Sequence, residues 1–222
     1  MLMSTRCAGQ HARETVERRR RRVLFTLAVL VSTAIVVAVI TRLAPVPVLA
    51  ISGALIGATK FLERFELPVI ERWSRGATGE EHVGNVLEEL VSEGWSTLYD
   101  VSTGRGNIDA VVVGSSGVFT VEVKSHGGRI PVDRISPEML SQAYAQKKWL
   151  EAITGRDVTP LLVFSRAYLV GRPVSRQRGV TVLPARMLAD HLRRYEAELR
   201  VDEARALYAR LAAALEPLGA AA

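Results

Sequence analysis

The feature that most constrains the fold is a pair of apolar segments, 107–113 and 118–124, joined by the short segment Gly114-Ser115-Ser116-Gly117. Two apolar runs around such a linker are typical of a β-hairpin. If the two serines form the tip, paired residue numbers sum to 231, and Asp109 faces Glu122 across the strands. Directly opposed residues in a ladder have their Cβ atoms roughly 4.5–5.5 Å apart. The sequence therefore predicts two neighbouring carboxylates on an otherwise apolar hairpin.

Two opposed carboxylates need a charge partner, because like charges facing each other destabilise a ladder. A hard divalent cation such as Mg²⁺ binds carboxylate oxygens while it keeps several waters. Lys124 lies two residues after Glu122 and therefore shares its face of the strand. A lysine beside such a cation can hold or deprotonate a water that attacks a phosphodiester bond. The alternative is a half-exposed hairpin whose charges only face solvent.

Four motifs occur in an order that resembles a known family. They are Gly76-Ala77-Thr78-Gly79-Glu80-Glu81, Gly106-Asn107-Ile108-Asp109, Gly114-Ser115-Ser116-Gly117-Val118-Phe119 and Val121-Glu122-Val123-Lys124. With them, the chain resembles the NERD (nuclease-related) domain over roughly residues 75–192, and that domain is similar to the wider PD-(D/E)XK nuclease superfamily. Ile108 stands where the superfamily's name has proline, so the resemblance to the NERD domain is the closer one.

The resemblance implies a Mg²⁺- or Mn²⁺-dependent nuclease that hydrolyses phosphodiester bonds. It implies a catalytic metal at Asp109 and Glu122 with Lys124 beside it, and an acidic residue on the preceding helix. It also implies a site-facing glutamine on the following helix, for which Gln142 is the candidate; a partly exposed polar residue without a role is the alternative. The implied partner is nucleic acid, with DNA as the first expectation and RNA left open.

The helix before the hairpin is predicted from apolar residues at positions i, i+3, i+4 and i+7, counted from Val83. Thr78 is its candidate N-cap. Glu80 precedes Val83 by three residues, so it lies on the buried face, whereas Glu81 points away. We therefore expect Glu80 to be the third metal-binding carboxylate. The alternative is a first-turn glutamate that the helix dipole favours.

The helix after the hairpin has clear end signals. Ser136 is a candidate N-cap, Pro137 occupies the first helical position, and Gly155 follows the last turn. Gln142 and Gln146 lie on one stripe of this helix, next to its apolar stripe. Further strands are expected at 95–101, 159–164 and 180–183, and further helices at 185–199 and 203–215.

These elements predict an α/β fold class, with a restriction-endonuclease-like mixed central β-sheet flanked by helices. An N-terminal transmembrane helical hairpin is expected to precede the sheet. The expected domains are a basic tail (1–22), two membrane helices within 23–62, a linker (63–74), the NERD domain (75–192) and a C-terminal helical extension (193–222).

The membrane hairpin is predicted from two apolar runs. Residues 23–40 are eighteen residues without a charge, directly after five arginines. This length fits a membrane span and exceeds the roughly 7–15 apolar residues of a cleaved signal peptide, which is the alternative. A second run, 43–59, contains Gly53 and Gly57 at a spacing that lets helices approach closely. We expect spans at about 23–41 and 46–62, joined by a turn at 41–47.

Basic residues lie before the first run and after the second, with only Arg42 between them. This pattern favours both ends in the cytoplasm. The expected localisation is the cell membrane, multi-pass with two spans, with the nuclease-like domain in the cytoplasm. If the second run does not span, the domain lies on the opposite side. Membrane lipid and a second copy, joined through Gly53 and Gly57, are the further expected partners.

The net charge of +6 does not by itself indicate nucleic-acid binding. Residues 1–22 carry a net +5, which leaves +1 for the remaining 200 residues. The single cysteine, Cys7, excludes an intramolecular disulfide. Two alternatives to the nuclease stay open: a catalytically inactive module that binds nucleic acid or protein, and a membrane scaffold.

Overall fold

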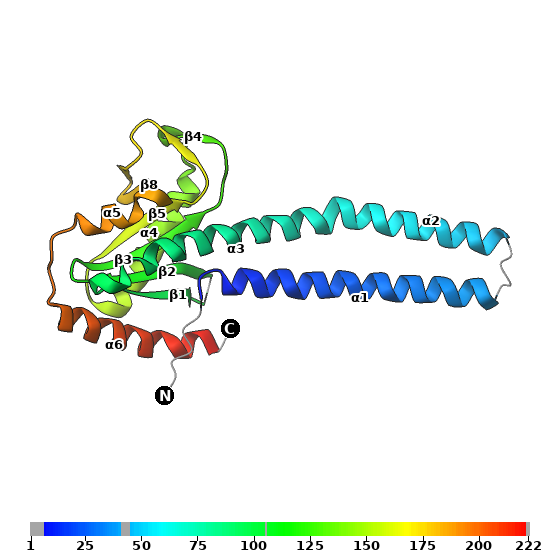
Figure 1. Cartoon of the computed structure of the whole chain (residues 1–222), viewed down its shortest axis with the longest axis horizontal. Coiled ribbons are helices and arrows are strands. Elements are labelled where there is room, and N and C mark those ends of the chain that lie inside the picture. The colour runs from blue at the N-terminus through cyan, green and yellow to red at the C-terminus, as the bar shows by residue number, and fades with distance from the viewer. Residues whose placement is uncertain (1–6, 41–44, 105, 221–222) are drawn as a thin grey trace. The chain divides into compact units, whose positions relative to one another are not determined.

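The computed structural model describes residues 7–40, 45–104 and 106–220 (Figure 1). The chain divides into two compact units. Unit 1 comprises Met1–Gln10 and Gly76–Ala222, and unit 2 comprises His11–Arg75. The predicted site residues all belong to unit 1, so the chemistry is confined to one compact body.

Unit 2 is helical. Its elements are α1 (Gln10–Ile40), α2 (Pro45–Phe61), the π-helical turn η1 (Leu62–Glu66) and the first part of α3 (Leu67–Glu88). The chain passes from α2 through η1 into α3 without a break, since the N–H of Leu67 bonds the carbonyl of Leu62. The residues predicted to be a linker, 63–74, are therefore helical.

The prediction of two membrane spans is wrong. Within the described residues, no helix is long and apolar enough to cross a membrane. Helix α2 has 17 residues and carries Lys60 in its last turn, whereas a span needs about 20 apolar residues. The predicted fold class and the cell-membrane localisation, which both included these spans, are wrong for the same reason.

The predicted role of Gly53 and Gly57 in helix association has no support either. No atom lies within 4 Å of the place where a Cβ would stand on either glycine. The described residues therefore provide no close packing partner at these positions, and contact with membrane lipid loses its basis together with the spans. Residues 41–44 of the predicted turn lie outside the described part of the chain.

A six-stranded sheet forms the centre of unit 1, in the order β1-β2-β3-β5-β8-β7. Strands β1, β2 and β3 are antiparallel, β3, β5 and β8 are parallel, and β7 is antiparallel to β8. The bounds are β1 (Ser96–Ser102), β2 (Asn107–Gly114), β3 (Gly117–Lys124), β5 (Val158–Phe164), β7 (Ser175–Gln177) and β8 (Val180–Pro184). Strand β8 is buried along its whole length and β5 nearly so, as parallel strands covered on both faces require.

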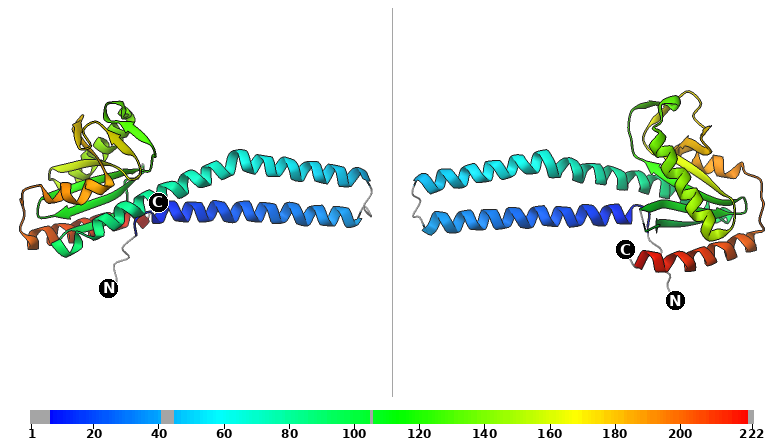
Figure 2. Two further views of the ribbon diagram at one scale, coloured as in Figure 1. Left: turned by 45° about the horizontal axis from the view of Figure 1, so that its top comes forward. Right: turned by 180° about the vertical axis from the view of Figure 1, so that it is seen from behind.

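Helices cover both faces of this sheet (Figure 2). On one face, α3 and α5 (Leu188–Arg193) pack through Leu87, Leu188 and Leu192 against β2, β3, β5 and β8. On the other face, α4 (Pro137–Thr154) and α6 (Val201–Ala220) pack through residues such as Leu150 and Leu211. The two layers leave the carboxyl ends of β3, β5 and β8 at one shared edge.

A small second sheet lies at that edge. It pairs β4 (Arg129–Pro131) with β6 (Tyr168–Val170) in parallel. Three short 3₁₀ turns complete the domain: η2 (Val91–Glu93), η3 (Val132–Arg134) and η4 (Ala185–Met187). The described part of the chain therefore has two separate sheets. Along the chain, β4 of the smaller sheet follows β3 of the larger one, and β6 follows β5.

Two local predictions from the sequence are confirmed and one is wrong. The hairpin has the predicted register from Ala110↔Val121 to Gly114↔Gly117. Helix α4 has Ser136 as its N-cap and Gly155 in the left-handed conformation as its C-cap, with φ 64°. Thr78 is not an N-cap, because α3 begins eleven residues earlier, at Leu67.

Candidate active site

The ladder of the central sheet is interrupted at Asp109. The pairing with β3 ends at Ala110, and the pairing with β1 skips the position at which Asp100 would face Asp109. Asp100 has a φ of 51°, a left-handed conformation that aspartate tolerates better than most residues. The carboxylate of Asp109 accepts a hydrogen bond from the backbone N–H of Val123 at 2.7 Å. A side chain, rather than a strand carbonyl, thus satisfies this donor of β3.

Glu122 is held at both of its oxygens. Lys124 Nζ donates to Glu122 Oε1 at 2.6 Å and to Gln142 Oε1 at 3.0 Å. Gln146 Nε2 donates to Glu122 Oε2 at 2.5 Å and to the carbonyl of Asn107 at 3.3 Å. Glu122 is only 3% exposed, so its charge is compensated mainly by these two donors. Helix α4 therefore contributes both glutamines to the end of the hairpin.

Glu80 reaches the site because α3 approaches the strand ends unusually closely. A Cβ on Gly79 would lie 2.6 Å from Ser165 Oγ and 2.8 Å from Ser125 Cβ. Ser125 directly follows Lys124, and the N–H of Ser165 bonds the carbonyl of Lys124 at 3.1 Å. Because α3 begins well before Glu80, the alternative of a first-turn glutamate stabilised by the helix dipole no longer applies.

Burial and neighbouring carboxylates raise the pKa of two carboxyls at this site, Glu80 and Asp109. Burial raises the pKa of Glu80 to about 7, and the carboxylates of Asp100 and Glu122 add to the rise, while Lys124 opposes it. Burial also raises the pKa of Asp109 well above its usual range, with further contributions from Glu122 and Glu80. These interactions show that Glu80, Asp109 and Glu122 share one electrostatic environment. We call these three carboxylates, together with Lys124, the carboxylate–lysine site.

The site suits a divalent cation with few protein ligands. In the described part of the chain, no three His, Cys, Asp or Glu side chains converge closely enough to enclose a metal ion. Magnesium, however, is often bound by one or two carboxylates and several waters. The buried oxygen Gln146 Oε1 has no hydrogen-bond donor, so an acceptor without a partner lies beside Glu122. Carboxyls with raised pKa values and an orphaned acceptor together fit a cation and its waters.

Two residues of this environment were missed in the sequence. Gln146 is 7% exposed and contacts Glu122 directly, whereas Gln142 reaches the site only through Lys124. Gln146 lies four residues after Gln142, so the two side chains share one face of the helix. This spacing is the pattern that could have identified Gln146 as a site residue. Asp100 is buried in the middle of β1, and its left-handed backbone leaves no trace in the residue pattern.

Glu80→Gln is expected to stabilise the fold at pH 8 but not at pH 4.5. The folded-state pKa of about 7 lies above the ordinary 4.5, so the stability that this carboxyl contributes is complete below pH 4.5 and is lost as pH rises through 7. The gain at pH 8 should be up to about 3 kcal/mol in the free energy of unfolding. Urea denaturation without divalent metal measures it, with Glu81→Gln as the matched exposed control. Equal pH profiles for Glu80→Gln and wild type would contradict the coupling.

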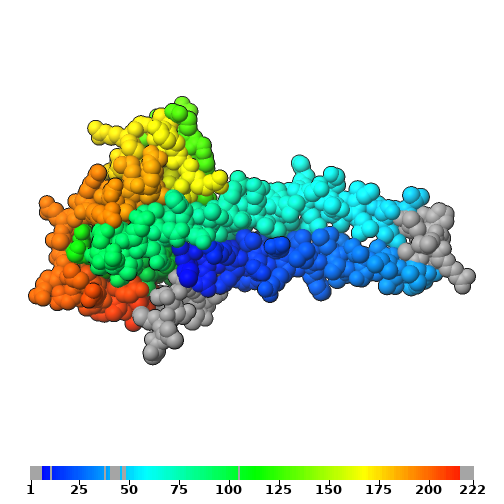
Figure 3. Space-filling view, in the orientation of Figure 1, coloured from blue at the N-terminus to red at the C-terminus, as the bar shows by residue number. Residues whose placement is uncertain are grey.

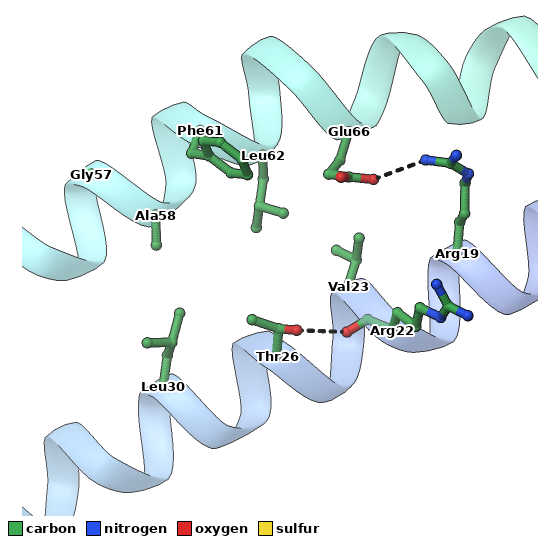
Figure 4. Close-up of a pocket in the computed structure, with 10 residues that line it drawn as sticks. All are labelled: Arg19, Arg22, Val23, Thr26, Leu30, Gly57, Ala58, Phe61, Leu62 and Glu66. Carbon is green, nitrogen blue, oxygen red and sulfur yellow. Dashed lines mark hydrogen bonds and ion pairs between the residues drawn. The ribbon is translucent and has the colours of Figure 1, made fainter.

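A cavity of about 550 Å³ lies elsewhere, in unit 2 (Figure 4). It lies between α1 and the α2–η1 segment, with apolar walls such as Leu30, Phe61 and Leu62. Arg19 and Glu66 form an ion pair of 3.6 Å at one end. None of the predicted site residues lines this cavity, so it is separate from the chemistry of unit 1.

Comparison with known proteins agrees with the geometry. Residues 75–165 match the family model of the nuclease-related domain, NERD. Over these residues the chain is similar to the nuclease-related domain. All residues of the carboxylate–lysine site, both glutamines and Asp100 lie inside the matched segment.

No curated protein matches the chain. Among solved structures, the chain is similar to a "repair endonuclease from Pyrococcus abyssi", with 18% identity and a TM-score of 0.28. That similarity covers 47% of this chain and 38% of the other, so the chain spans well under half of that endonuclease. Such a low TM-score carries no argument about fold or activity.

Proposed function

We propose that the NERD domain hydrolyses phosphodiester bonds in nucleic acid, with DNA as the first candidate, at the carboxylate–lysine site. The observation that carries the proposal is the ion pair between Lys124 and the buried Glu122, with Asp109 at the adjacent break in the ladder. A buried carboxylate, a lysine and a second carboxylate at one strand end are the groups that such hydrolysis uses. They lie in a segment that matches a nuclease-related family.

Asp109 and Glu122, helped by Glu80, would hold Mg²⁺ or Mn²⁺. When bound, the cation supplies positive charge against the negative charge that builds up on the phosphate during attack. Without it, burial and then repulsion between the carboxylates disfavour the charged forms of Glu80 and Asp109 and raise their pKa values. The chain's own residues therefore favour a cation at this place.

Lys124 is placed to orient the attacking water or a phosphate oxygen of the substrate. Its ammonium is partly exposed, while Glu122 and Gln142 accept two of its hydrogen bonds. An ammonium has three donors, so one remains for a phosphate oxygen or for the attacking water. Gln142 fixes the direction of this third donor from α4. Gln146 fixes the second oxygen of Glu122 in the same way.

A cleavage assay with the full chain tests this function. Wild type is expected to cut labelled DNA or RNA with Mg²⁺ or Mn²⁺ and to stop with EDTA. Lys124→Met should slow cleavage about 10²-fold or more, because positioned proton-transfer groups typically contribute that much. Lys148→Met is the matched control, since Lys148 is exposed on α4 and pairs only with Glu151 among the carboxylates of the described residues.

Equal cleavage rates for wild type and Lys124→Met at every metal concentration would refute the proposed role. Binding of nucleic acid without any cleavage would instead identify a module that binds but does not cut. A thermal shift with Mg²⁺ separates metal binding from turnover. It should be present in wild type and lost in Asp109→Asn.

A further inference from the structure

Acidic and basic residues are unevenly distributed along the sequence of the domain, although their numbers nearly balance. Residues 76–124, which carry the carboxylates, have eight acidic and two basic residues. Residues 166–186 have five arginines and no Asp or Glu. This second segment lies beyond the residues that match the NERD family. Residues 166–186 therefore carry five positive charges with no acidic residue among them, outside the segment that matches the family.

Two arginines and an exposed tyrosine meet in this region. The guanidinium of Arg129 lies 5.3 Å from the ring centroid of Tyr168, and that of Arg186 lies 5.6 Å from it. Tyr168 is 52% exposed, and both arginines are exposed as well. In the described part of the chain, neither arginine forms an ion pair with a carboxylate. We call these three residues the tyrosine–arginine patch.

The topology places this patch at the same edge as the carboxylate–lysine site. The parallel strands β3, β5 and β8 end side by side, with Lys124 opposite Phe164 and Phe164 opposite Pro184. Each strand leads within a few residues into one member of the patch, as the order of the chain shows: Arg129 follows β3, Tyr168 follows β5, and Arg186 follows β8. Carboxyl ends of parallel strands form the ligand-binding edge of α/β sheets.

The strands that carry Arg129 and Tyr168 are fixed to each other. Strands β4 and β6 pair directly, and the N–H of Tyr168 bonds the carbonyl of Gly128 at 2.8 Å. Figure 3 shows the green segment around β4 and the yellow segment after β6 side by side at the surface. Gly171, at the end of β6, has a φ of 104°, a left-handed backbone that favours glycine. The small sheet therefore presents its tyrosine at a defined place.

We propose that the tyrosine–arginine patch is a stacking site for an unpaired base, and that the domain's substrate is single-stranded nucleic acid. Both guanidiniums lie over the half-exposed Tyr168 ring. Aromatic rings stack on bases, and neighbouring arginines add stacking and phosphate contacts in single-strand binding sites. In a duplex the base faces are covered by neighbouring bases, so Tyr168 has no partner there. The inference rests on the proposed nuclease function, because it names the substrate of the same edge.

Binding without divalent metal tests the patch separately from cleavage. The probe is a fluorescein-labelled dT oligonucleotide, and its affinity is measured by anisotropy in EDTA. Tyr168→Ala should weaken binding about 10–100-fold, because one base stacked on an aromatic ring typically contributes that much. Tyr168→Phe should retain the affinity. Tyr144→Ala is the matched control, since Tyr144 is another exposed tyrosine beside a single cation, Lys148.

An oligonucleotide of the same length with abasic residues separates stacking from phosphate contact. If Tyr168 stacks on a base, wild type and Tyr168→Ala should bind the abasic strand equally. Arg129→Ala and Arg186→Ala should weaken both strands and each lower the slope of log K against log salt by about 0.7. A wild-type affinity that is equal for dT, abasic and duplex probes would overturn the proposal and indicate a general polyanion surface.

The outcomes also distinguish this inference from the proposed function. Cleavage by wild type with unchanged binding by Tyr168→Ala would refute the patch alone. Base-dependent binding without any cleavage would support the patch and refute the nuclease. Where both hold, Tyr168→Ala should raise KM for single strands and leave kcat nearly unchanged, because Tyr168 binds substrate away from the reacting bond.

Discussion

Glu122→Ala is expected to reduce metal-dependent cleavage more than about 10³-fold and to destabilise the domain by about 3–5 kcal/mol. The first effect follows because Glu122 is the carboxylate that both orients Lys124 and would hold the cation. The second follows because the substitution leaves the Lys124 ammonium and the buried Gln146 amide without their shared acceptor. Cleavage rates and urea denaturation of the same preparation measure both effects.

Two companion variants separate these effects. Glu122→Gln keeps an amide that can still hydrogen-bond, so it should lose cleavage almost as fully while it loses less stability than Glu122→Ala. Glu196→Ala removes an exposed glutamate of unit 1 and should change neither quantity. If Glu122→Ala kept both its stability and its cleavage rate, the ion pair with Lys124 would have neither a structural nor a catalytic role.

The hairpin and α4 could be predicted from the sequence because their signals are local. Gly114 and Gly117 fix the turn, and a symmetric turn fixes the register of the strands that follow. Ser136 and Gly155 mark the ends of α4 through their own backbone conformations. What could not be predicted is the ladder's interruption at Asp109. It depends on β1, a strand from outside the hairpin, and on the left-handed backbone of Asp100.

The start of α3 was misjudged because a glycine can mark the boundary of a helix or allow close packing inside one, and the sequence does not distinguish these two roles. Thr78 was the predicted N-cap, yet it lies with Gly76 and Gly79 inside a helix that begins at Leu67. The reason for Gly79 is tertiary: only a residue without a Cβ lets α3 lie against Ser125 and Ser165. The misjudged start still left Glu80 on the correct face, because helical periodicity does not depend on where a helix begins.

The membrane prediction failed because it used the apolar runs without the elements around them. The first run lies in α1, and no helix of the described residues is long and apolar enough to cross a membrane. The second run lies in α2, which at 17 residues falls short of a span and continues through η1 into α3. Gln142 and Gln146 both lie on the predicted face of α4: Gln142 accepts a hydrogen bond from Lys124, and the more deeply buried Gln146 contacts Glu122.

Gly79→Ala is expected to lower the cleavage rate about 10²-fold and to destabilise the domain by about 1–3 kcal/mol. The added Cβ would stand 2.6 Å from Ser165 Oγ and 2.8 Å from Ser125 Cβ. The hydroxyl of Ser165 can rotate away, but Ser125 Cβ is fixed to the backbone that follows Lys124. Helix α3 must therefore move from the strand ends, and Glu80 moves with it away from the site.

Gly76→Ala provides a control in the same helix, because no atom lies within 4 Å of the place where its Cβ would stand. Alanine is the better helix former by roughly 1 kcal/mol, so this variant should be slightly more stable than wild type and equally active. Adding Ser125→Gly and Ser165→Gly to Gly79→Ala removes both obstructing side chains. Activity should then return, even if two new glycines lower stability. Full activity of Gly79→Ala alone would show that Glu80 does not need this close approach.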